Sequence, residues 1–185
     1  TNAGGPGILA ADALIAGGGR PTQLSAESLA ALDQLLPDYW NRGNPVDILG
    51  DATPERFAQA LEIVANDKET NGVLVILTPQ DMTQPTQTAE LVRDAVVDLR
   101  KPVITSWMGG AEIASGESIL NQAEIPTLSY PDSAARVFNY MAQYARTIER
   151  LYETPTTIMD DANRQERMER VQALSLIHIS EPTRP

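Results

Sequence analysis

The sequence predicts an α/β domain built on an open, doubly wound, mostly parallel sheet. Two apolar runs, Gly72–Leu77 (GVLVIL) and Pro102–Trp107 (PVITSW), show no alternation of polar and apolar residues. Such runs are typical of strands that are covered on both faces, as in a parallel sheet. Segments with helical periodicity lie between and around these runs, and strands that alternate with helices favour this architecture. We therefore expect the sheet to form the middle layer of the domain.

Three helices are expected before the first buried run, over residues 6–16, 26–36 and 54–66. Pro6 lies in the first turn of the first helix, where its missing N–H costs nothing. Ser25 and Thr53 each precede a helix, as N-cap residues do. Between these helices we expect a short strand at Pro21–Leu24 and a loop at Asn41–Gly50.

The second half of the sequence predicts helices over residues 88–99, 111–122 and 133–152. Pro126–Leu128 is expected to form an edge strand before the last of these helices. After Pro155 the composition becomes polar, and Asp160–Ala173 is expected to be an exposed helix or a linker. We expect no metal site, because the acidic residues of this stretch match no pattern of metal ligands and are expected to form a solvated face.

Length and charge limit the classes of function. A chain of 185 residues has room for one domain, and 42% hydrophobic residues are enough for a core. With 14 basic and 25 acidic residues the net charge is −11, which disfavours binding to nucleic acid or to an anionic membrane. The sequence has no cysteine, which excludes disulfides and thiolate sites. With no apolar run that could span a bilayer, a cytoplasmic protein is expected.

The two ends of the sequence are unusual. A glycine-rich turn follows Thr1 directly, and because such turns usually follow a strand, we expect the first strand of the sheet to be truncated. The run LSLIHISEPTRP, over residues 174–185, resembles a translated sequencing adapter, although a genuine apolar tail is an alternative. His178 is the sole histidine and lies within this run, so it is not a candidate base or ligand.

Ligands of a parallel sheet bind outside the carboxyl ends of its strands, where residues 2–7, 78–80 and 107–110 are expected to gather. Glycines at positions 4, 5 and 7 allow the backbone N–H groups of the first stretch to approach a ligand closely. The helix that follows directs its unpaired N–H groups and its positive dipole end to the same point, which indicates an anion site and favours phosphate. A tight turn without a ligand is the alternative.

Other phosphate-binding patterns fit less well. Gly5, Gly7 and Ala10 match the dinucleotide fingerprint, and Glu27 stands near the distance expected for a ribose contact. However, Glu27 falls in the first turn of a predicted helix rather than at the end of a strand. No Gly-Lys-Ser/Thr follows the turn, which excludes the Walker pattern, and residues 2–7 lack the hydroxyls of an FMN loop.

Five blocks, namely TNAGGPGILAADAL, GNPVDILGDATPERF, GVLVILTPQ, KPVITSWMGG and IPTLSYPDSAARVFNYM, follow one another in order between Thr1 and about Pro155. They closely resemble the second succinyl-CoA-synthetase-like, flavodoxin-like domain of NDP-forming acyl-CoA (acetate–CoA) synthetases. The ATPERF, SWMGG and LYETP segments look most like the branch that also carries a protein-lysine acetyltransferase domain. The resemblance implies a CoA-ligase domain over 1–155, a polar linker or helix toward an ATP-grasp domain over 156–173, and an artefactual tail over 174–185.

In that family a phosphohistidine carries phosphate between the acyl-phosphate/CoA site and the nucleotide site. The resemblance places this histidine in another domain, so it implies no catalytic residue in this chain and no turnover by the chain alone. It implies that the turn supplies one of two opposed helix N-termini that hold the phosphohistidine, with phosphate-binding residues Asn2, Ala3, Gly4, Gly5, Pro6 and Gly7. It also implies, with less direct support from the motif, the cleft-lining residues Asn44, Asp47, Gln80, Trp107, Gly109 and Gly110. Asp47 can instead cap a turn, and Trp107 can instead belong to the core.

The implied activity is that of an acid–thiol ligase, an ADP-forming acetate–CoA ligase. ATP/ADP, Mg and CoA would serve the full-length protein, and none of them would be bound by this domain alone. The implied partners are the phosphohistidine-bearing, CoA-binding and ATP-grasp domains of the same protein. Two alternatives stay open: an acyl-CoA-sensing regulatory domain of a protein-lysine acetyltransferase, and a simple nucleotide-binding module.

Overall fold

The computed structural model describes residues 1–153 and 168–172. By its internal contacts the chain divides into two units, residues 1–146 and residues 147–185. The sheet and the predicted site belong to the first unit. Of the second unit, the structure describes the end of the last long helix and the exposed helical residues 168–172. The adapter-like tail at 174–185, and most of the polar stretch at 156–173, lie outside the described residues.

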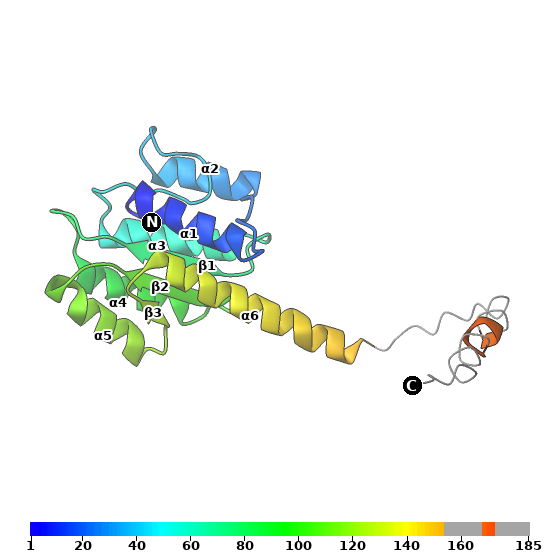
Figure 1. The fold of residues 1–185 in the computed structure, drawn as a ribbon. Coiled ribbons are helices and arrows are strands. Elements are labelled where there is room, and N and C mark those ends of the chain that lie inside the picture. The colour runs from blue at the N-terminus through cyan, green and yellow to red at the C-terminus, as the bar shows by residue number, and fades with distance from the viewer. Residues whose placement is uncertain (154–167, 173–185) are drawn as a thin grey trace. The chain divides into compact units, whose positions relative to one another are not determined.

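The sheet has three parallel strands in the order β1-β2-β3 (Figure 1). Val73–Leu77 (β1) pairs in register with Val103–Trp107 (β2), and β2 also pairs with the two-residue edge strand Thr127–Leu128 (β3). The helices are α1 (Gly4–Ala16), α2 (Ala26–Leu35), α3 (Pro54–Asn66), α4 (Pro85–Val96), the short 3-10 helix η1 (Ala111–Ile113), α5 (Ala114–Gln122) and α6 (Pro131–Tyr152). A parallel sheet flanked by helices confirms the predicted α/β class.

The helix starts follow from local chemistry. The Ser25 hydroxyl accepts a hydrogen bond from the Ser28 N–H, and the Thr53 hydroxyl accepts one from the Arg56 N–H. These bonds satisfy backbone donors that a helix leaves free in its first turn, as predicted for both N-caps. The α4 helix begins at Pro85, three residues earlier than expected, because Pro is well placed in a first turn even though Gln84 offers no side-chain cap.

The core lies between the sheet and the helices of the middle of the chain. Val75, Leu77, Val103 and Trp107 alternate along their strands, so they point to one face of the sheet. They belong to one buried apolar cluster with residues of the helices and loops around them, among them Leu32, Trp40, Ile48, Phe57, Leu61, Val92 and Leu120. Ile76 and Ile104 point to the opposite face and are also buried. The sheet is therefore covered on both faces, as the unbroken apolar runs predicted.

The predicted strand at Pro21–Leu24 is wrong: these residues form no strand in the described structure. The segment connects α1 with α2, and no described strand pairs with it. This segment is instead held by a side-chain hydrogen bond, in which Asn44 Nδ2 donates to the Thr22 carbonyl at 3.0 Å. Because no neighbouring strand pairs with it, this segment forms a loop.

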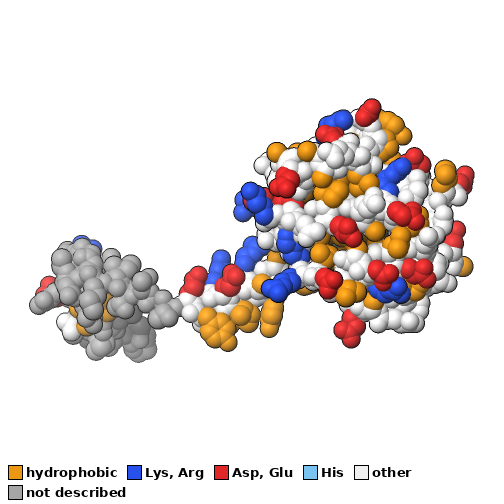
Figure 2. Space-filling view, turned by 180° about the vertical axis from the view of Figure 1, so that it is seen from behind, with side chains coloured by type: hydrophobic (Ala, Val, Ile, Leu, Met, Phe, Trp, Pro, Cys, Tyr) orange, Lys and Arg blue, Asp and Glu red, His pale blue; other side chains and the backbone are white. Residues whose placement is uncertain are grey.

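The last helix is strongly amphipathic. Seen from behind, Figure 2 shows hydrophobic side chains along one side of the distal part of α6 and charged side chains along the other. Its first half carries the buried residues, Pro131, Ala134, Ala135 and Asn139. Within residues 1–153 and 168–172, none of the helices is long and apolar enough to cross a membrane.

Candidate functional site

The carboxyl ends of β1 and β2 lie side by side, and the segments that follow them contact one another. The Met108 N–H donates to the Leu77 carbonyl at 2.9 Å. The Thr78 hydroxyl lies 3.8 Å from the Met108 sulfur. A Cβ placed on Gly109 would lie 2.9 Å from the Pro79 ring. The structure thus joins two of the three stretches that the sequence predicted to gather here.

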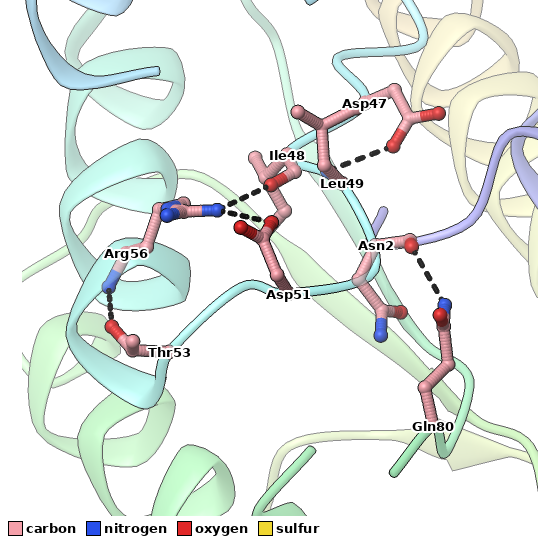
Figure 3. A network of polar contacts seen from close by, with 8 residues as sticks. All are labelled: Asn2, Asp47, Ile48, Leu49, Asp51, Thr53, Arg56 and Gln80. Atoms are coloured by element: carbon pink, nitrogen blue, oxygen red, sulfur yellow. Dashed lines mark hydrogen bonds and ion pairs between the residues drawn. The ribbon is translucent and has the colours of Figure 1, made fainter. Parts of the chain in front are cut away.

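Asn2 joins the N-terminal turn to this edge of the sheet. Its amide group makes two hydrogen bonds to the backbone of Thr78: Nδ2 donates to the Thr78 carbonyl at 2.8 Å, and Oδ1 accepts from the Thr78 N–H at 2.9 Å. Gln80 Nε2 donates to the Asn2 carbonyl at 3.1 Å (Figure 3). The Asn2 residue is only 1% exposed. Both hydrogen-bonding groups of the Asn2 side chain are therefore engaged inside the protein.

Residues 44–47, within the loop predicted at Asn41–Gly50, lie against the same turn. The Thr1 amino group donates to the Val46 carbonyl at 3.0 Å, and the Ile48 N–H donates to the Thr1 carbonyl at 2.8 Å. A Cβ on Gly7 would lie 2.9 Å from Thr1 Cγ2 and 3.1 Å from Pro45 Cβ. Gly7 is thus required by close packing. Residues 1–7 therefore contact both the 44–48 segment and the segment after β1, and residues 107–110 contact the latter segment from its other neighbour, β2.

The first turn of α1 is open to solvent. Gly4 and Gly5 are exposed, and a Cβ on Gly5 would meet nothing within 4 Å. Among the described residues, no side chain caps this helix and its first turn holds no acidic residue. The Gly7 N–H points back to the Ala3 carbonyl at 3.4 Å, and Pro6 has no N–H. The N–H groups of Gly4 and Gly5 are therefore the donors that the turn can offer to an anion.

Asp47 brings a negative charge close to these donors. Its Oδ2 lies 3.1 Å from the position of a Cβ on Gly4, while its Oδ1 accepts the Leu49 N–H at 3.0 Å. The latter bond is the turn-capping role that we considered for Asp47. Burial lowers the pKa of the Thr1 amino group to about 6, although the Asp47 carboxylate acts in the opposite direction. The local charge thus opposes a free anion.

Arg56 is the cation of the neighbouring network, but its contacts are internal. Its Nη1 donates to the Ile48 carbonyl at 3.2 Å and to Asp51 Oδ1 at 2.8 Å (Figure 3). Asp51 therefore neutralises the guanidinium beside the 44–50 loop. Arg56 is therefore engaged within the protein, and an anion at the start of α1 would meet the backbone N–H dipoles of the helix there.

The remaining predicted residues fall into different environments. Asn44 is exposed and bonds to the Thr22 carbonyl, and Gly110 is exposed at the start of η1. Trp107 is 1% exposed and belongs to the hydrophobic cluster. It therefore does not line an open surface, because β2 is buried on both faces and the Trp107 side chain at its end points into the core. A Cβ on Gly116 would lie 2.9 Å from the indole nitrogen of Trp107.

Sequence reasoning missed the role of Thr78, because its contribution comes from the backbone and carries no side-chain signal. Two shallow surface hollows lie away from the N-terminal turn, one against α5 and one at the start of α4. In residues 1–153 and 168–172, no group of three or more His, Cys, Asp or Glu residues could hold a metal ion. Glu27 lies in the first turn of α2 rather than at the end of a strand, as expected.

Comparisons with known proteins give a consistent result. The Ligase-CoA domain family matches residues 1–152. The chain is 36% identical over 146 residues to "Acetate--CoA ligase [ADP-forming] I" of Archaeoglobus fulgidus, covering 79% of this chain and 20% of the relative. It is 29% identical over 153 residues to "Acetate--CoA ligase [ADP-forming] II subunit alpha" of Pyrococcus furiosus, covering 80% and 33%. The chain therefore spans a fifth to a third of the length of these relatives.

Solved structures agree with the sequence matches. A crystal structure of a protein from Pyrococcus horikoshii OT3 superposes with a TM-score of 0.74 at 28% identity, over 78% of this chain and 34% of that chain. A dinucleotide-forming acetyl-coenzyme A synthetase 1 of Ca. Korarchaeum cryptofilum, in complex with phosphate and ADP, gives 0.73 at 26% identity, over 78% and 32%. With the family match covering most of the sequence, the chain belongs to the Ligase-CoA domain family.

Proposed function

We propose that this chain is the CoA-ligase domain of an ADP-forming acyl-CoA ligase of the acetate–CoA type, and that the start of α1 holds a phosphoryl group during the reaction. The observation that carries this proposal is the open first turn of α1, where Gly4 and Gly5 are exposed and uncapped among the described residues. The names of the relatives support the activity, and the proposed net reaction converts an acid, CoA and ATP into acyl-CoA, ADP and phosphate.

The electrostatics of the turn indicate how the phosphoryl group arrives. Backbone N–H dipoles attract an anion at any pH, but Asp47 lies beside Gly4 and the whole chain carries a net charge of −11. A free anion would therefore bind weakly. A phosphoryl group bound covalently to another domain is present at a high effective concentration, on the order of millimolar, so a weak site is sufficient for it. This favours delivery on a phosphohistidine of a partner domain.

The contribution of the chain to catalysis is then positioning and charge stabilisation. Phosphoryl transfer needs little covalent chemistry from the protein beyond these effects. Gly4 and Gly5 would donate hydrogen bonds to phosphoryl oxygens, and their missing side chains leave room for the incoming group. CoA, the nucleotide and Mg would be bound by the CoA-binding and ATP-grasp domains of the complete protein.

A chimeric enzyme tests the proposal. Residues 1–152 replace the corresponding segment of the Archaeoglobus fulgidus ligase, and acetyl-CoA formation from acetate, CoA and ATP is measured. We expect the chimera to be active, Gly5→Ala to remain active, and Gly5→Glu to lose about a hundredfold in rate, because a carboxylate would occupy the place of the phosphoryl group. Thr86→Glu is the matched control, since Thr86 is the exposed second residue of α4 as Gly5 is of α1.

Two results would overturn the proposal. One is a Gly5→Glu chimera that is folded, by circular dichroism, and as active as the Thr86→Glu chimera. The other is turnover of acetate, CoA and ATP by the 185-residue chain alone, because the proposal requires that other domains supply the histidine and the nucleotide site.

A further inference from the structure

We infer that Asn2 is a positioning residue for the phosphoryl site, not one of its ligands. This inference rests on the proposed function. The family resemblance implied that Asn2 is a phosphate-binding residue, but both groups of its side-chain amide bond to the backbone of Thr78. At 1% exposure the side chain is closed to solvent, so an incoming phosphoryl group cannot reach it.

The geometry shows what Asn2 holds. Its two bonds, at 2.8 and 2.9 Å, reproduce the donor and acceptor pattern that a neighbouring strand would offer to Thr78. A third bond, from Gln80 Nε2 at 3.1 Å, reaches the Asn2 main-chain carbonyl. The backbone of residue 2 is thus fixed to the end of β1 both through its side chain and through its carbonyl.

One residue, Ala3, separates this anchor from the first proposed donor, Gly4. Thr1 fixes Ala3, since the Thr1 hydroxyl donates to the Ala3 carbonyl at 2.8 Å. Gly4 and Gly5 have no side chains that could fix their backbone, and the φ and ψ angles of glycine are less restricted than those of any other residue. The direction of their N–H groups therefore depends on the rigid segment just before them, and Asn2 connects that segment to the sheet.

Phosphate binding by the full 185-residue chain tests the inference. The protein is labelled with ¹⁵N and titrated with inorganic phosphate at constant ionic strength, and the amide signals of Gly4 and Gly5 are followed. In the unmodified chain both signals should shift with a millimolar affinity. In Asn2→Ala we expect the affinity to fall about tenfold, because misplaced donors lose much of their effect. Gln80→Ala should cause a smaller loss, since it keeps the side-chain pair with Thr78.

The control is a variant that is destabilised elsewhere. Asp67 precedes β1 whereas Thr78 follows it, so the two sites lie at opposite ends of this strand. Asp67→Asn should lower the melting temperature, because it weakens the hydrogen bonds that the Asp67 carboxylate accepts from the Ser25 and Glu69 N–H groups, but should leave the phosphate affinity unchanged. If Asn2→Ala does not fold, Asn2→Ser replaces it and should also weaken binding.

The outcomes separate the two proposals. Phosphate binding at Gly4 and Gly5 that is equally strong in Asn2→Ala and in Asp67→Asn would overturn the positioning role while leaving the phosphate site intact. If phosphate does not shift these signals even in the unmodified chain, the phosphate-holding function itself is wrong, and the inference about Asn2 is wrong with it. Within the chimeric ligase, the positioning role further predicts that Asn2→Ala lowers kcat while the KM for CoA stays unchanged.

Discussion

Asp67 is a buried carboxylate that joins the end of α3 to the start of α2, and replacing it with Asn tests how the fold is held. The residue is 3% exposed. Its Oδ2 accepts the Ser25 N–H at 2.8 Å and its Oδ1 accepts the Glu69 N–H at 2.8 Å. Asn can keep one of these bonds but would turn an NH₂ group toward the other donor. Since a hydrogen bond to a charged group contributes about 1.5–3 kcal/mol, we expect a loss of about 2–3 kcal/mol in the free energy of unfolding.

The effect should depend on pH in a definite direction. Burial by itself would raise the pKa of Asp67, but hydrogen bonds from the Ser28 hydroxyl and from the Ser25 and Glu69 N–H groups outweigh it and hold the pKa well below its usual value. A carboxyl whose pKa is lowered by folding stabilises the native state fully above the unfolded pKa, near 4. This contribution is lost as the pH falls from about 4 through the lower folded value. The difference between the two proteins should therefore shrink in acid.

Thermal unfolding followed by circular dichroism measures this difference. A change of about 2–3 kcal/mol corresponds to a decrease of about 4–12 °C in Tm for a chain of this size. Asp98→Asn is the matched control, because Asp98 is exposed on the connection from α4 to β2; it should change stability by less than about 0.5 kcal/mol. A stabilising role of the Asp67 carboxylate is ruled out if Asp67→Asn and the control have the same Tm at pH 7, or if the loss in stability of Asp67→Asn is as large at pH 3 as at pH 7.

Four further substitutions have defined expectations. Asp47→Asn removes a charge beside Gly4 and should strengthen phosphate binding about fivefold in the ¹⁵N titration; weaker binding would contradict this electrostatic role. Gly116→Ala should destabilise by about 2–3 kcal/mol in urea unfolding, since its Cβ would lie 2.7 Å from the Pro85 carbonyl, and a neutral effect would argue against this helix contact. Gly5→Ala should be neutral or stabilising by about 0.5–1 kcal/mol, whereas Gly7→Ala should cost about 1–3 kcal/mol; equal effects in thermal melts would show that the two glycines are not distinguished by packing.

The helices and strands could be predicted because their signals are local. For α3, the N-cap Thr53, the Pro at its first position and the end at Asn66 all agree with the structure. The strands β1 and β2 each start one residue later than predicted and end at the predicted residue. The failure at Pro21–Leu24 has a tertiary cause: a short extended segment becomes a strand when a neighbour pairs with it, and the segment itself does not record whether one does.

The candidate site could be predicted in part. The rule that ligands bind at the carboxyl ends of parallel strands predicted that residues 2–7 gather with the segments after β1 and β2, and the structure shows Asn2 bonded to the segment after β1, which in turn contacts the segment after β2. The rule says nothing about which atoms each side chain meets. The engagement of Asn2 with the Thr78 backbone and the approach of Asp47 to Gly4 depend on contacts across 76 and 43 positions of the chain. The resemblance implied that Trp107 lines a cleft, whereas its burial at the end of a strand that is covered on both faces agrees with the alternative, a core role.

The burial of two tryptophans gives this chain natural optical probes. Trp40 is 2% exposed and its indole nitrogen donates to Asp33 at 2.7 Å, near the carboxylate charge. Trp107 is 1% exposed at the end of β2, and within the described residues its indole nitrogen has no hydrogen-bond partner. Their fluorescence emission should therefore differ in the native state and become alike on unfolding. Trp40→Phe and Trp107→Phe variants would each leave one emitter, so that loosening of the segment after α2 could be distinguished from melting of the sheet.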